Sequence, residues 1–296
     1  YWLLGLRQTG AEFELFKAFE NEINEHYKTQ GKHIRIHVVF IPTAPDQLIP
    51  RLLHGRGDIA AGILTITPER LEQVDFGTPF FRGVKEIAVT GPASPELASV
   101  DDLSGKEVFV RKSSSYWTHL ERLNERFKDE NKPPVILKAA PEDLQDDDLL
   151  EMVNAGLVGI VVVDRYQALL WAQVFKKLKP HRGVVINKGG DIAWMIRKES
   201  PKLRAEIGAF AKAYGQKSDF GKALVKKYTG SPRIVKPATS AGEIKKFNAT
   251  VALFRKYGAQ YEMDYLLMMA QGYQESLLDQ TAISQVGAIG VMQIMP

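Results

Sequence analysis

Glu275 is the residue of this chain whose setting best suits proton-transfer chemistry. It lies near the end of a segment with helical periodicity, residues 262–277. Four apolar side chains of that segment fall on one narrow stripe: Leu266, Ala270, Tyr273 and Leu277. Glu275 lies about 180° from the stripe, so we expect the stripe to pack into a core and Glu275 to face a cleft. Carbonyl groups of a last helical turn disfavour negative charge and raise a carboxyl pKa, which suits a general acid near neutral pH.

The residues before this helix predict an alternation of short strands and amphipathic helices, from Phe13 to about Tyr228. Such alternation predicts parallel sheets with helices on both faces. The predicted strands are residues 33–40, 59–64, 108–110, 158–163, 184–186 and 192–196, with helices such as 117–129 and 165–177 between them. Residues 52–60 and 152–160 share a helix–glycine–strand plan that suggests two similar lobes, although such junctions are common in this fold class.

The character of the sequence changes after Tyr228. Residues 230–242 (GSPRIVKPATSAG) are rich in residues typical of linkers. Beyond them the strand pattern stops, and residues 243–257 and 262–277 both predict helices. We therefore expect a domain boundary within the linker.

Composition limits the function classes. Lys and Arg number 39 and Asp and Glu 35, and the charges are interspersed, which does not favour nucleic-acid binding. The absence of cysteine excludes thiol chemistry and Cys-ligated metals, and no motif indicates another metal or a cofactor. The longest apolar run, residues 160–163, is far shorter than the roughly 18 residues that span a membrane. Both ends of the chain look cut, so we expect a fragment of a longer protein whose targeting or membrane-anchoring segment is absent here.

Two stretches of the first part carry a resemblance to a known family. Residues 61–70 (AGILTITPER) and 74–81 (VDFGTPFF) resemble the signature of periplasmic amino-acid-binding proteins. Residues 10–15 are similar to the early helix start of that family, and residues 101–108 to the opening of its second lobe. The likeness covers roughly residues 5–230. It implies an α/β two-lobed periplasmic-binding-protein fold of type II.

The resemblance implies a ligand site between the lobes. Arg70, with Thr65 nearby, matches the family's arginine that holds an α-carboxylate through two coplanar N–H donors. Asp164 matches the carboxylate that holds the α-ammonium. Ser113, Ser114 and Ser115 fall where the second lobe offers hydroxyl and N–H groups at a helix start. Taken alone, Arg70 is typical of a solvated surface charge and Asp164 of a helix N-cap. Gly159 and the serine run depart from the family pattern, so the identity of the ligand stays open.

The C-terminal stretch carries a second resemblance. Residues 275–276 (ES), 284 (S), 287–290 (GAIG) and 292–296 (MQIMP) are similar in order and spacing to the pattern of lytic transglycosylases. The resemblance implies the start of an α-helical, lysozyme-like domain with Glu275 as its catalytic residue. Ser284 and Gln293 are expected in the substrate groove, although Gln293 fits a structural role in its loop equally well. Asp279 is a second carboxylate nearby, for which a loop-cap role is favoured.

For this family the resemblance implies a reaction with one carboxyl group rather than the usual pair of glycosidases. Glu275 would protonate the bond between N-acetylmuramic acid and N-acetylglucosamine and then accept a proton from the muramoyl C6 hydroxyl. The product would be a 1,6-anhydro end, formed without water. Spacing alone does not separate this lyase from a hydrolytic lysozyme.

The two parts together resemble the membrane-bound lytic transglycosylase F family. We expect a solute-binding-like domain at residues 1–230, with lobe 1 at about 1–91 and 190–230 and lobe 2 at about 92–189. A linker at 231–242 and a truncated catalytic domain at 243–296 follow. The resemblance implies a bacterial periplasmic location associated with the outer membrane, glycan strands as substrate, and an amino acid or stem-peptide fragment as regulatory ligand. We expect the fragment to be inactive alone. The alternative is a transport or sensing protein without catalysis.

Overall fold

The computed structural model describes residues 2–4, 7–31, 35–92, 94–229, 241–284 and 286–296. The chain divides into two compact units. The first contains Gly10–Pro232, and the second contains Trp2–Thr9 and Arg233–Pro296. Strands β1 (Trp2–Leu4) and β2 (Arg7–Thr9) form an antiparallel pair. Among the described residues, none of the helices has the length and apolar character needed to cross a membrane.

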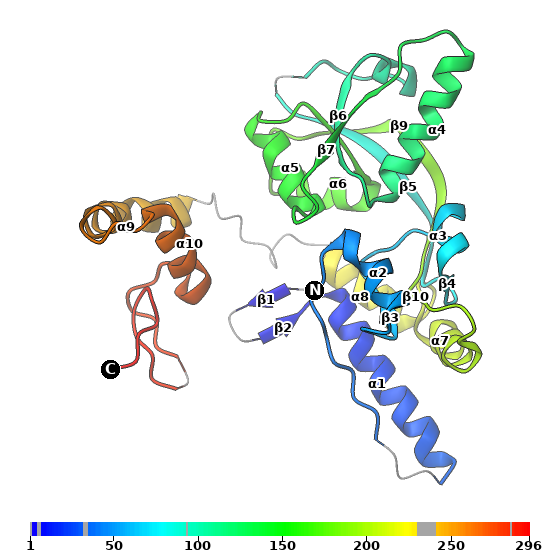
Figure 1. Ribbon diagram of the computed structural model, residues 1–296, viewed down its shortest axis with the longest axis horizontal. Coiled ribbons are helices and arrows are strands. Elements are labelled where there is room, and N and C mark those ends of the chain that lie inside the picture. Colours follow the sequence, from blue (N-terminus) through cyan, green and yellow to red (C-terminus); the bar gives the residue numbers. More distant parts are fainter. Residues whose placement is uncertain (1, 5–6, 32–34, 93, 230–240, 285) are drawn as a thin grey trace. The chain divides into compact units, whose positions relative to one another are not determined.

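Lobe 1 of the first unit is built on a small sheet with the order β3-β10-β4 (Figure 1). Its strands are β3 (Ile59–Ala60), β4 (Asp75–Phe76) and β10 (Met195–Ile196), and β10 is antiparallel to both neighbours. The helical elements of this lobe are α1 (Ala11–Thr29), η1 (Pro45–Gln47), α2 (Leu48–Leu53), α3 (Pro68–Gln73), α7 (Pro201–Tyr214) and α8 (Asp219–Thr229).

The core of lobe 1 is aromatic. Trp194 is almost fully buried and stacks on Phe16, with ring centroids 4.0 Å apart. Phe80 and Phe210 pack on the same indole at 4.5 and 6.0 Å. Phe16 of α1, Phe80 and Phe210 of α7 thus surround the Trp194 indole. Aromatic pairs of this kind add to the free energy gained by burying apolar surface.

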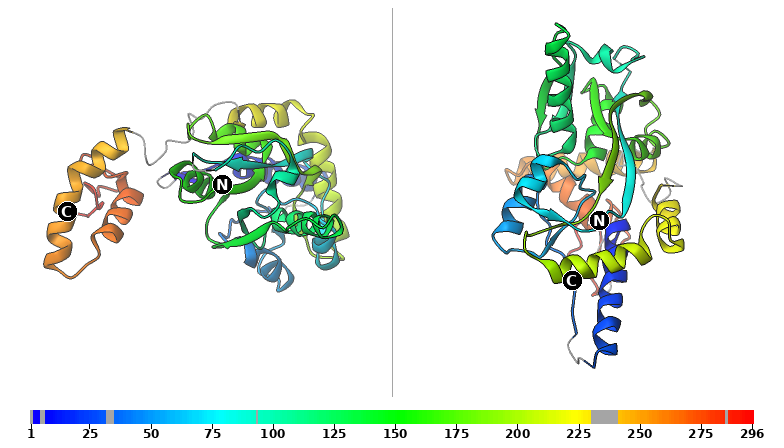
Figure 2. Two further views of the ribbon diagram at one scale, coloured as in Figure 1. Left: turned by 90° about the horizontal axis from the view of Figure 1, so that it is seen from above. Right: turned by 90° about the vertical axis from the view of Figure 1, so that its right-hand side faces the viewer.

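Lobe 2 has a five-stranded sheet with the order β7-β6-β8-β5-β9. The strands are β5 (Phe81–Thr90), β6 (Glu107–Arg111), β7 (Ile136–Ala140), β8 (Ile160–Asp164) and β9 (Lys179–Ile192). The connecting helical elements are η2 (Val100–Leu103), α4 (Ser115–Asp129), α5 (Asp146–Ala155) and α6 (Arg165–Trp171). The crossovers β6–α4–β7 and β7–α5–β8 step in opposite directions along the sheet, which puts α4 and α5 on opposite faces (Figures 1 and 2).

The expectation of parallel sheets holds only in part. Parallel pairing holds for β6 with β7 and β8, whereas β5 runs antiparallel to β8 and to β9. The reason is topological, because β5 leaves lobe 1 and β9 returns to it, so the two strands must run in opposite directions beside each other. Their pairing contains several register shifts.

The strand predicted at residues 33–40 is also not formed over residues 35–40, and residues 33 and 34 lie outside the described part. Side chains of α1, rather than a neighbouring strand, form hydrogen bonds with backbone groups of this segment. The Asn24 amide donates to the Ile36 carbonyl and accepts the Ile36 N–H, at 2.8 and 2.7 Å. The Glu20 carboxylate accepts the Val38 N–H at 2.7 Å.

The second unit contains α9 (Ala241–Gln260) and α10 (Tyr265–Ser276), followed by a loop to Pro296. Its small core is formed by the buried Met269, Leu278 and Val291, with Tyr265 and Tyr273 packed against them. The stripe predicted to be buried was wrong for three of its four members, because Leu266 is 52% exposed, Leu277 is 46% exposed and Ala270 is also exposed. The packed face of α10 is turned by about a quarter of a circle from the predicted one, because the loop covers Gly272 rather than Ala270.

Candidate functional sites

Arg70 connects the two lobes of the first unit. Thr67 caps the N-terminus of α3 and accepts the Arg70 N–H, which fixes the backbone of this turn. The Arg70 guanidinium donates to the Thr65 carbonyl of lobe 1 at 2.7 Å and to the Ser113 carbonyl of lobe 2 at 2.8 Å. Burial lowers the pKa of Arg70, an effect that the nearby Glu86 opposes. Among the described residues no carboxylate forms an ion pair with Arg70, so its charge is left for another partner.

Thr65 is 4% exposed and forms an isolated antiparallel bridge with Ile192 at the end of β9. Its contribution to Arg70 is therefore the backbone carbonyl. The structure brings the predicted pair together, and the contact runs through the main chain of Thr65.

The three serines of lobe 2 are all engaged within the protein. Ser113 donates its N–H and its hydroxyl to the Glu142 carboxylate, at 3.1 and 2.5 Å. Ser114 caps α4 by accepting the N–H of Trp117 at 3.3 Å. Ser115 donates to Glu86 at 3.0 Å.

Asp164 ends β8 as a buried carboxyl group that lacks a full set of partners. It is 1% exposed, and its Oδ1 has no hydrogen-bond partner among the described residues. It does not cap α6 with its side chain, which removes the N-cap alternative. Burial raises the pKa of Asp164 well above its usual value, and the negative charges of Glu86 and Asp146 add to the effect. A buried carboxyl with an unused acceptor is an expected receptor for a cation.

Several charged residues around Asp164 were not predicted from the sequence. Glu86 is 1% exposed and accepts from Ser115 and from His119, whose Nδ1 lies 2.7 Å away. Arg111 and Asp146 form a largely buried ion pair at 2.5 Å. The signal for Glu86 was available, since it is a single acidic residue next to the apolar run 87–89.

Glu12 is a further carboxylate in lobe 1 that sequence analysis missed. It accepts the Trp194 indole N–H at 3.1 Å and a hydrogen bond from the Ile63 backbone. Burial raises the pKa of Glu12, and these two hydrogen bonds lower it by less. Ile63 lies two residues before Thr65, so Glu12 is attached to the loop that holds Arg70.

Glu275 is exposed in the last turn of α10. Leu277 and Leu278 take left-handed backbone conformations, with φ of 55° and 54°, and end the helix directly after Ser276. The Ser276 hydroxyl donates to the Val291 carbonyl at 2.9 Å and accepts the Asp279 N–H at 3.1 Å. The residue beside Glu275 therefore fixes the following loop to the helix end.

The loop after α10 holds the other predicted residues of the second unit. Ser284 accepts the Ala288 N–H at 2.9 Å. The Gln293 amide donates to the carbonyl groups of Gly290 and Ala282, at 2.8 and 3.2 Å. Gln293 thus makes the structural contacts that were one of its two predicted roles.

Asp279 takes the loop-cap role expected for it. Its Oδ1 accepts the hydroxyl and the N–H of Thr281, at 2.7 and 2.8 Å. These hydrogen bonds lower the pKa of Asp279. A carboxyl group in this state is poorly suited to act as a general acid.

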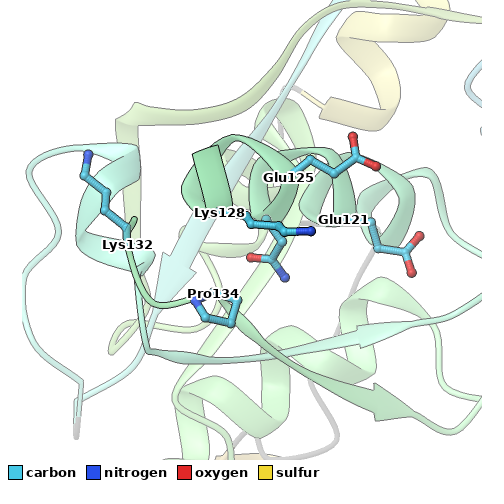
Figure 3. A pocket seen from close by; sticks show the side chains of 6 residues that line it. Glu121, Glu125, Lys128, Lys132 and Pro134 are labelled. Carbon is cyan, nitrogen blue, oxygen red and sulfur yellow. The ribbon is translucent and has the colours of Figure 1, made fainter. Parts of the chain in front are cut away.

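Two other features do not form candidate sites. An open depression beside α4 is lined by charges of both signs and by none of the predicted ligand residues (Figure 3). Its lining consists of Glu121, Asn124, Glu125, Lys128, Lys132 and Pro134. In the described ranges, His, Asp and Glu do not gather in any group of three or more that could hold a metal ion.

Comparison with solved structures supports the architecture. An ancestral arginine-binding protein bound to arginine is 24% identical, with a TM-score of 0.60 over 75% of this chain and 88% of that one. The amino acid transporter substrate-binding protein AbpA from Streptococcus pneumoniae, bound to L-arginine, is 20% identical, with a TM-score of 0.62 over 77% and 87%. These similarities confirm the predicted two-lobed fold.

Comparison with families and relatives covers both units. Bacterial extracellular solute-binding proteins, family 3, match residues 7–231, and the transglycosylase SLT domain matches residues 252–296. Proteins called membrane-bound lytic murein transglycosylase F are 25% identical in Desulfosudis oleivorans and 29% in Ectopseudomonas mendocina, over 99% and 97% of this chain. The chain spans 61% and 56% of their lengths. The chain belongs to the family 3 bacterial extracellular solute-binding proteins, joined to a transglycosylase SLT domain as in the membrane-bound lytic murein transglycosylase F family.

Proposed function

We propose that this chain is part of a peptidoglycan lytic transglycosylase, a lyase that cleaves between N-acetylmuramic acid and N-acetylglucosamine. The observation that carries the proposal is Glu275, which is solvent-accessible at the end of α10 within the segment that matches the SLT domain. The relatives that match nearly the whole chain carry the name of this activity.

In the proposed reaction Glu275 acts twice. Its carboxyl proton passes to the glycosidic oxygen, and the bond from that oxygen to the muramoyl C1 breaks. The carboxylate then accepts the proton of the muramoyl C6 hydroxyl while the C6 oxygen bonds to C1. Glu275 ends protonated, and the products are a free N-acetylglucosamine 4-hydroxyl and a 1,6-anhydro end. Since Asp279 is engaged by Thr281, we assign it no catalytic role.

Ser284 and Gln293 are proposed to shape the sugar groove beside Glu275. Their contacts to Ala288, Gly290 and Ala282 support a role in holding the loop that forms the wall. We propose that the Gln293 side-chain oxygen contacts the sugar.

The test uses the full-length protein on purified sacculi. We expect release of anhydro-muropeptides by the wild type and at most trace release by Glu275→Gln. Glu262→Gln is the matched control, because Glu262 is an exposed glutamate in the turn between α9 and α10. Release by Glu275→Gln at the wild-type rate would exclude Glu275 as the catalytic residue. Reducing muramic acid ends in place of anhydro ends would indicate a hydrolase.

We further propose that the two-lobed domain, residues 1–230 with the linker 231–242, binds an amino acid or a stem-peptide fragment. Arg70 would hold the α-carboxylate and Asp164 the α-ammonium, since in the described part of the chain the side chain of Arg70 donates to carbonyl groups and Asp164 has an unused acceptor. Ligand binding would regulate the catalytic domain that begins at residue 243. Regulation requires different ligand affinity in the active and inactive arrangements.

The proposed location is the bacterial periplasm, with attachment to the outer membrane through a segment outside this sequence. The names of the relatives support membrane attachment. Regulation is tested by the rate of anhydro-muropeptide release with and without ligand. An unchanged rate at saturating ligand would leave the two-lobed domain as a binding module without regulatory function.

A further inference from the structure

Two neighbouring residues of α3 in lobe 1, Glu69 and Arg70, both contact lobe 2. The Glu69 carboxylate pairs with the guanidinium of Arg122 in α4 at 2.5 Å. The Arg70 guanidinium donates to the Ser113 carbonyl, just before α4, at 2.8 Å. Both contacts join atoms of the protein itself, so they hold α3 against α4 without a contribution from a ligand.

The first turn of α3 fixes the backbone from which both side chains extend. Thr67 caps this helix and Pro68 is its first residue. A capping side chain and an N-terminal proline both restrict the backbone of a first turn. Glu69 and Arg70 follow directly, and a carboxylate in this position is also favoured by the helix dipole. The two contacts to lobe 2 therefore start from one well-defined turn.

The two contacts reach the region of α4 at separate points. Ser113 lies before the first helical residue, Ser115, whereas Arg122 lies seven residues after that first residue. Seven residues correspond to about 10 Å along a helix axis. Because the contacts are this far apart, together they oppose rotation of α4 about either of them. They therefore restrain the orientation of lobe 2 relative to lobe 1.

The strands that connect the lobes have features of a hinge. β5 and β9 pair side by side where the chain passes between the lobes (Figure 1). Their register shifts between Phe81 and Val84 and again between Val84 and Glu86. Gly83 in β5 and Gly189 in β9 have φ values of 70° and 84°, in the left-handed region that favours glycine. A few such residues can absorb the backbone change of a hinge motion, so contacts away from the hinge decide the angle between the lobes.

We propose that Glu69 and Arg122 form an ion-pair latch that keeps the two lobes closed before a ligand binds. The Glu69 and Arg122 side chains are 49% and 43% exposed, and exposed ion pairs shift an equilibrium by up to about fivefold. Helices α6 and α8 of the two lobes also approach each other, so loss of the latch should shift the equilibrium rather than abolish closure. The inference goes beyond the proposed ligand site, because it concerns the ligand-free domain.

The latch has a consequence for any ligand of the cleft. A domain that is already closed when empty undergoes a smaller change of population when the ligand binds. Entry of the ligand also requires the ion pair between Glu69 and Arg122 to open first. Exposed charges of this kind are screened by salt, so the fraction of closed domain should depend on ionic strength.

The test measures the distance between two spin labels in the ligand-free, 296-residue chain by double electron–electron resonance. The chain contains no cysteine, so Gln73→Cys in α3 and Lys128→Cys in α4 introduce the only thiols, both at exposed positions. We expect mainly the short distance of the closed domain at low salt. Arg122→Gln and Glu69→Gln should each shift the ratio of short to long distances about two- to fivefold towards the long one.

Charge reversal separates the ion pair from a packing effect. Arg122→Glu should shift the ratio further than Arg122→Gln, because two carboxylates then face each other, and the added change Glu69→Arg should move it back towards the wild type. Arg126→Gln is the matched control, since Arg126 is a similarly exposed residue of α4 that pairs with Asp101 inside lobe 2. A wild-type distribution in Arg122→Glu, or equal shifts in Arg126→Gln and Arg122→Gln, would overturn the latch.

Salt provides a second test without a further substitution. Raising the salt concentration from about 0.05 M to about 0.5 M should move the wild type towards the long distance and change Arg122→Gln much less. An equal response of the two proteins would contradict the latch. Failure of amino acids to bind at Arg70 and Asp164 would contradict the proposed ligand site and would leave these distances unaffected.

Discussion

Glu86 and Asp164 stand directly opposite each other on the antiparallel strands β5 and β8, and each is 1% exposed. Opposed residues of neighbouring strands point to the same face of the sheet. Glu86 has two donors, from Ser115 and His119, whereas one oxygen of Asp164 has none among the described residues. Asp164 therefore has an acceptor oxygen left for a bound cation.

Replacing Asp164 by Asn should weaken ligand binding and stabilise the ligand-free protein. The raised pKa of Asp164 means that ionisation costs stability in the folded state. The stability of the wild type should fall as the pH rises from the ordinary aspartate range through this raised pKa, and the variant should lack that loss. We expect a higher melting temperature for Asp164→Asn at neutral pH and an affinity lower by about 2–5 kcal/mol. A lower melting temperature at neutral pH would contradict the assignment.

Ligand affinity should fall as the pH is lowered towards and below the raised pKa of Asp164, because the ammonium group binds the ionised carboxylate. Binding should therefore release a proton. Titrations in two buffers with different heats of ionisation measure that proton. Its absence, with pH-independent affinity, would mean that Asp164 does not hold the ammonium.

Arg70→Lys should lower the affinity about tenfold or more, although the positive charge is kept. The guanidinium reaches the Thr65 and Ser113 carbonyls with two nitrogen atoms, and an ammonium cannot offer two coplanar donors. Arg122→Lys is the control, because Arg122 makes an exposed ion pair with Glu69, which is worth about 0–1 kcal/mol. Equal affinities for Arg70→Lys and the wild type would exclude bidentate carboxylate binding.

Gly272→Ala should disturb the loop that follows Glu275. An added Cβ would lie 2.7 Å from Val291 Cγ1 and 3.2 Å from Met292 Sδ. We expect the free energy of unfolding to fall by about 1–3 kcal/mol and the activity of the full-length protein to be reduced, although Glu275 itself is unchanged. Ala270→Ser, on the exposed side of the same helix, should change stability by less than about 0.5 kcal/mol. Wild-type activity in Gly272→Ala would show that the loop tolerates displacement.

Asp147 gives a second pH effect in lobe 2. Burial raises its pKa to about 6, and Asp148 and Asp146 add to the rise. The group therefore destabilises the fold as the pH increases from about 4 through 6. Asp147→Asn should raise the melting temperature at pH values above about 7 and leave it unchanged near pH 3, where both forms are neutral. A rise of equal size at both pH values would point to a packing effect.

Much of the fold and of the segment proposed to be catalytic could be predicted because local patterns carry the information. The strand ending at Asp164 and the helix after Ser114 follow from apolar runs and capping residues. The failures arose where tertiary contacts decide. Residues 35–40 have strand periodicity but are bonded by Asn24 and Glu20 of α1, and the packed side of α10 is set by the close approach of Val291 to Gly272.

The proposed ligand site was only partly predictable for a related reason. Arg70 and Asp164 lie in recognisable motifs, whereas the contacts of Glu12 and Glu86 are made with residues far away in the sequence. Trp194 approaches Glu12 across 182 positions, and His119 reaches Glu86 across 33. Periodicity does not report such pairings.

Whether Glu275 catalyses a cleavage without water can be measured by digesting sacculi in water enriched in oxygen-18. Mass spectrometry of the released muropeptides then reports the chemistry at the muramoyl C1. We expect anhydro ends with no oxygen-18 from the wild type and no comparable product from Glu275→Gln. Incorporation of oxygen-18 at that carbon by the wild type would contradict it.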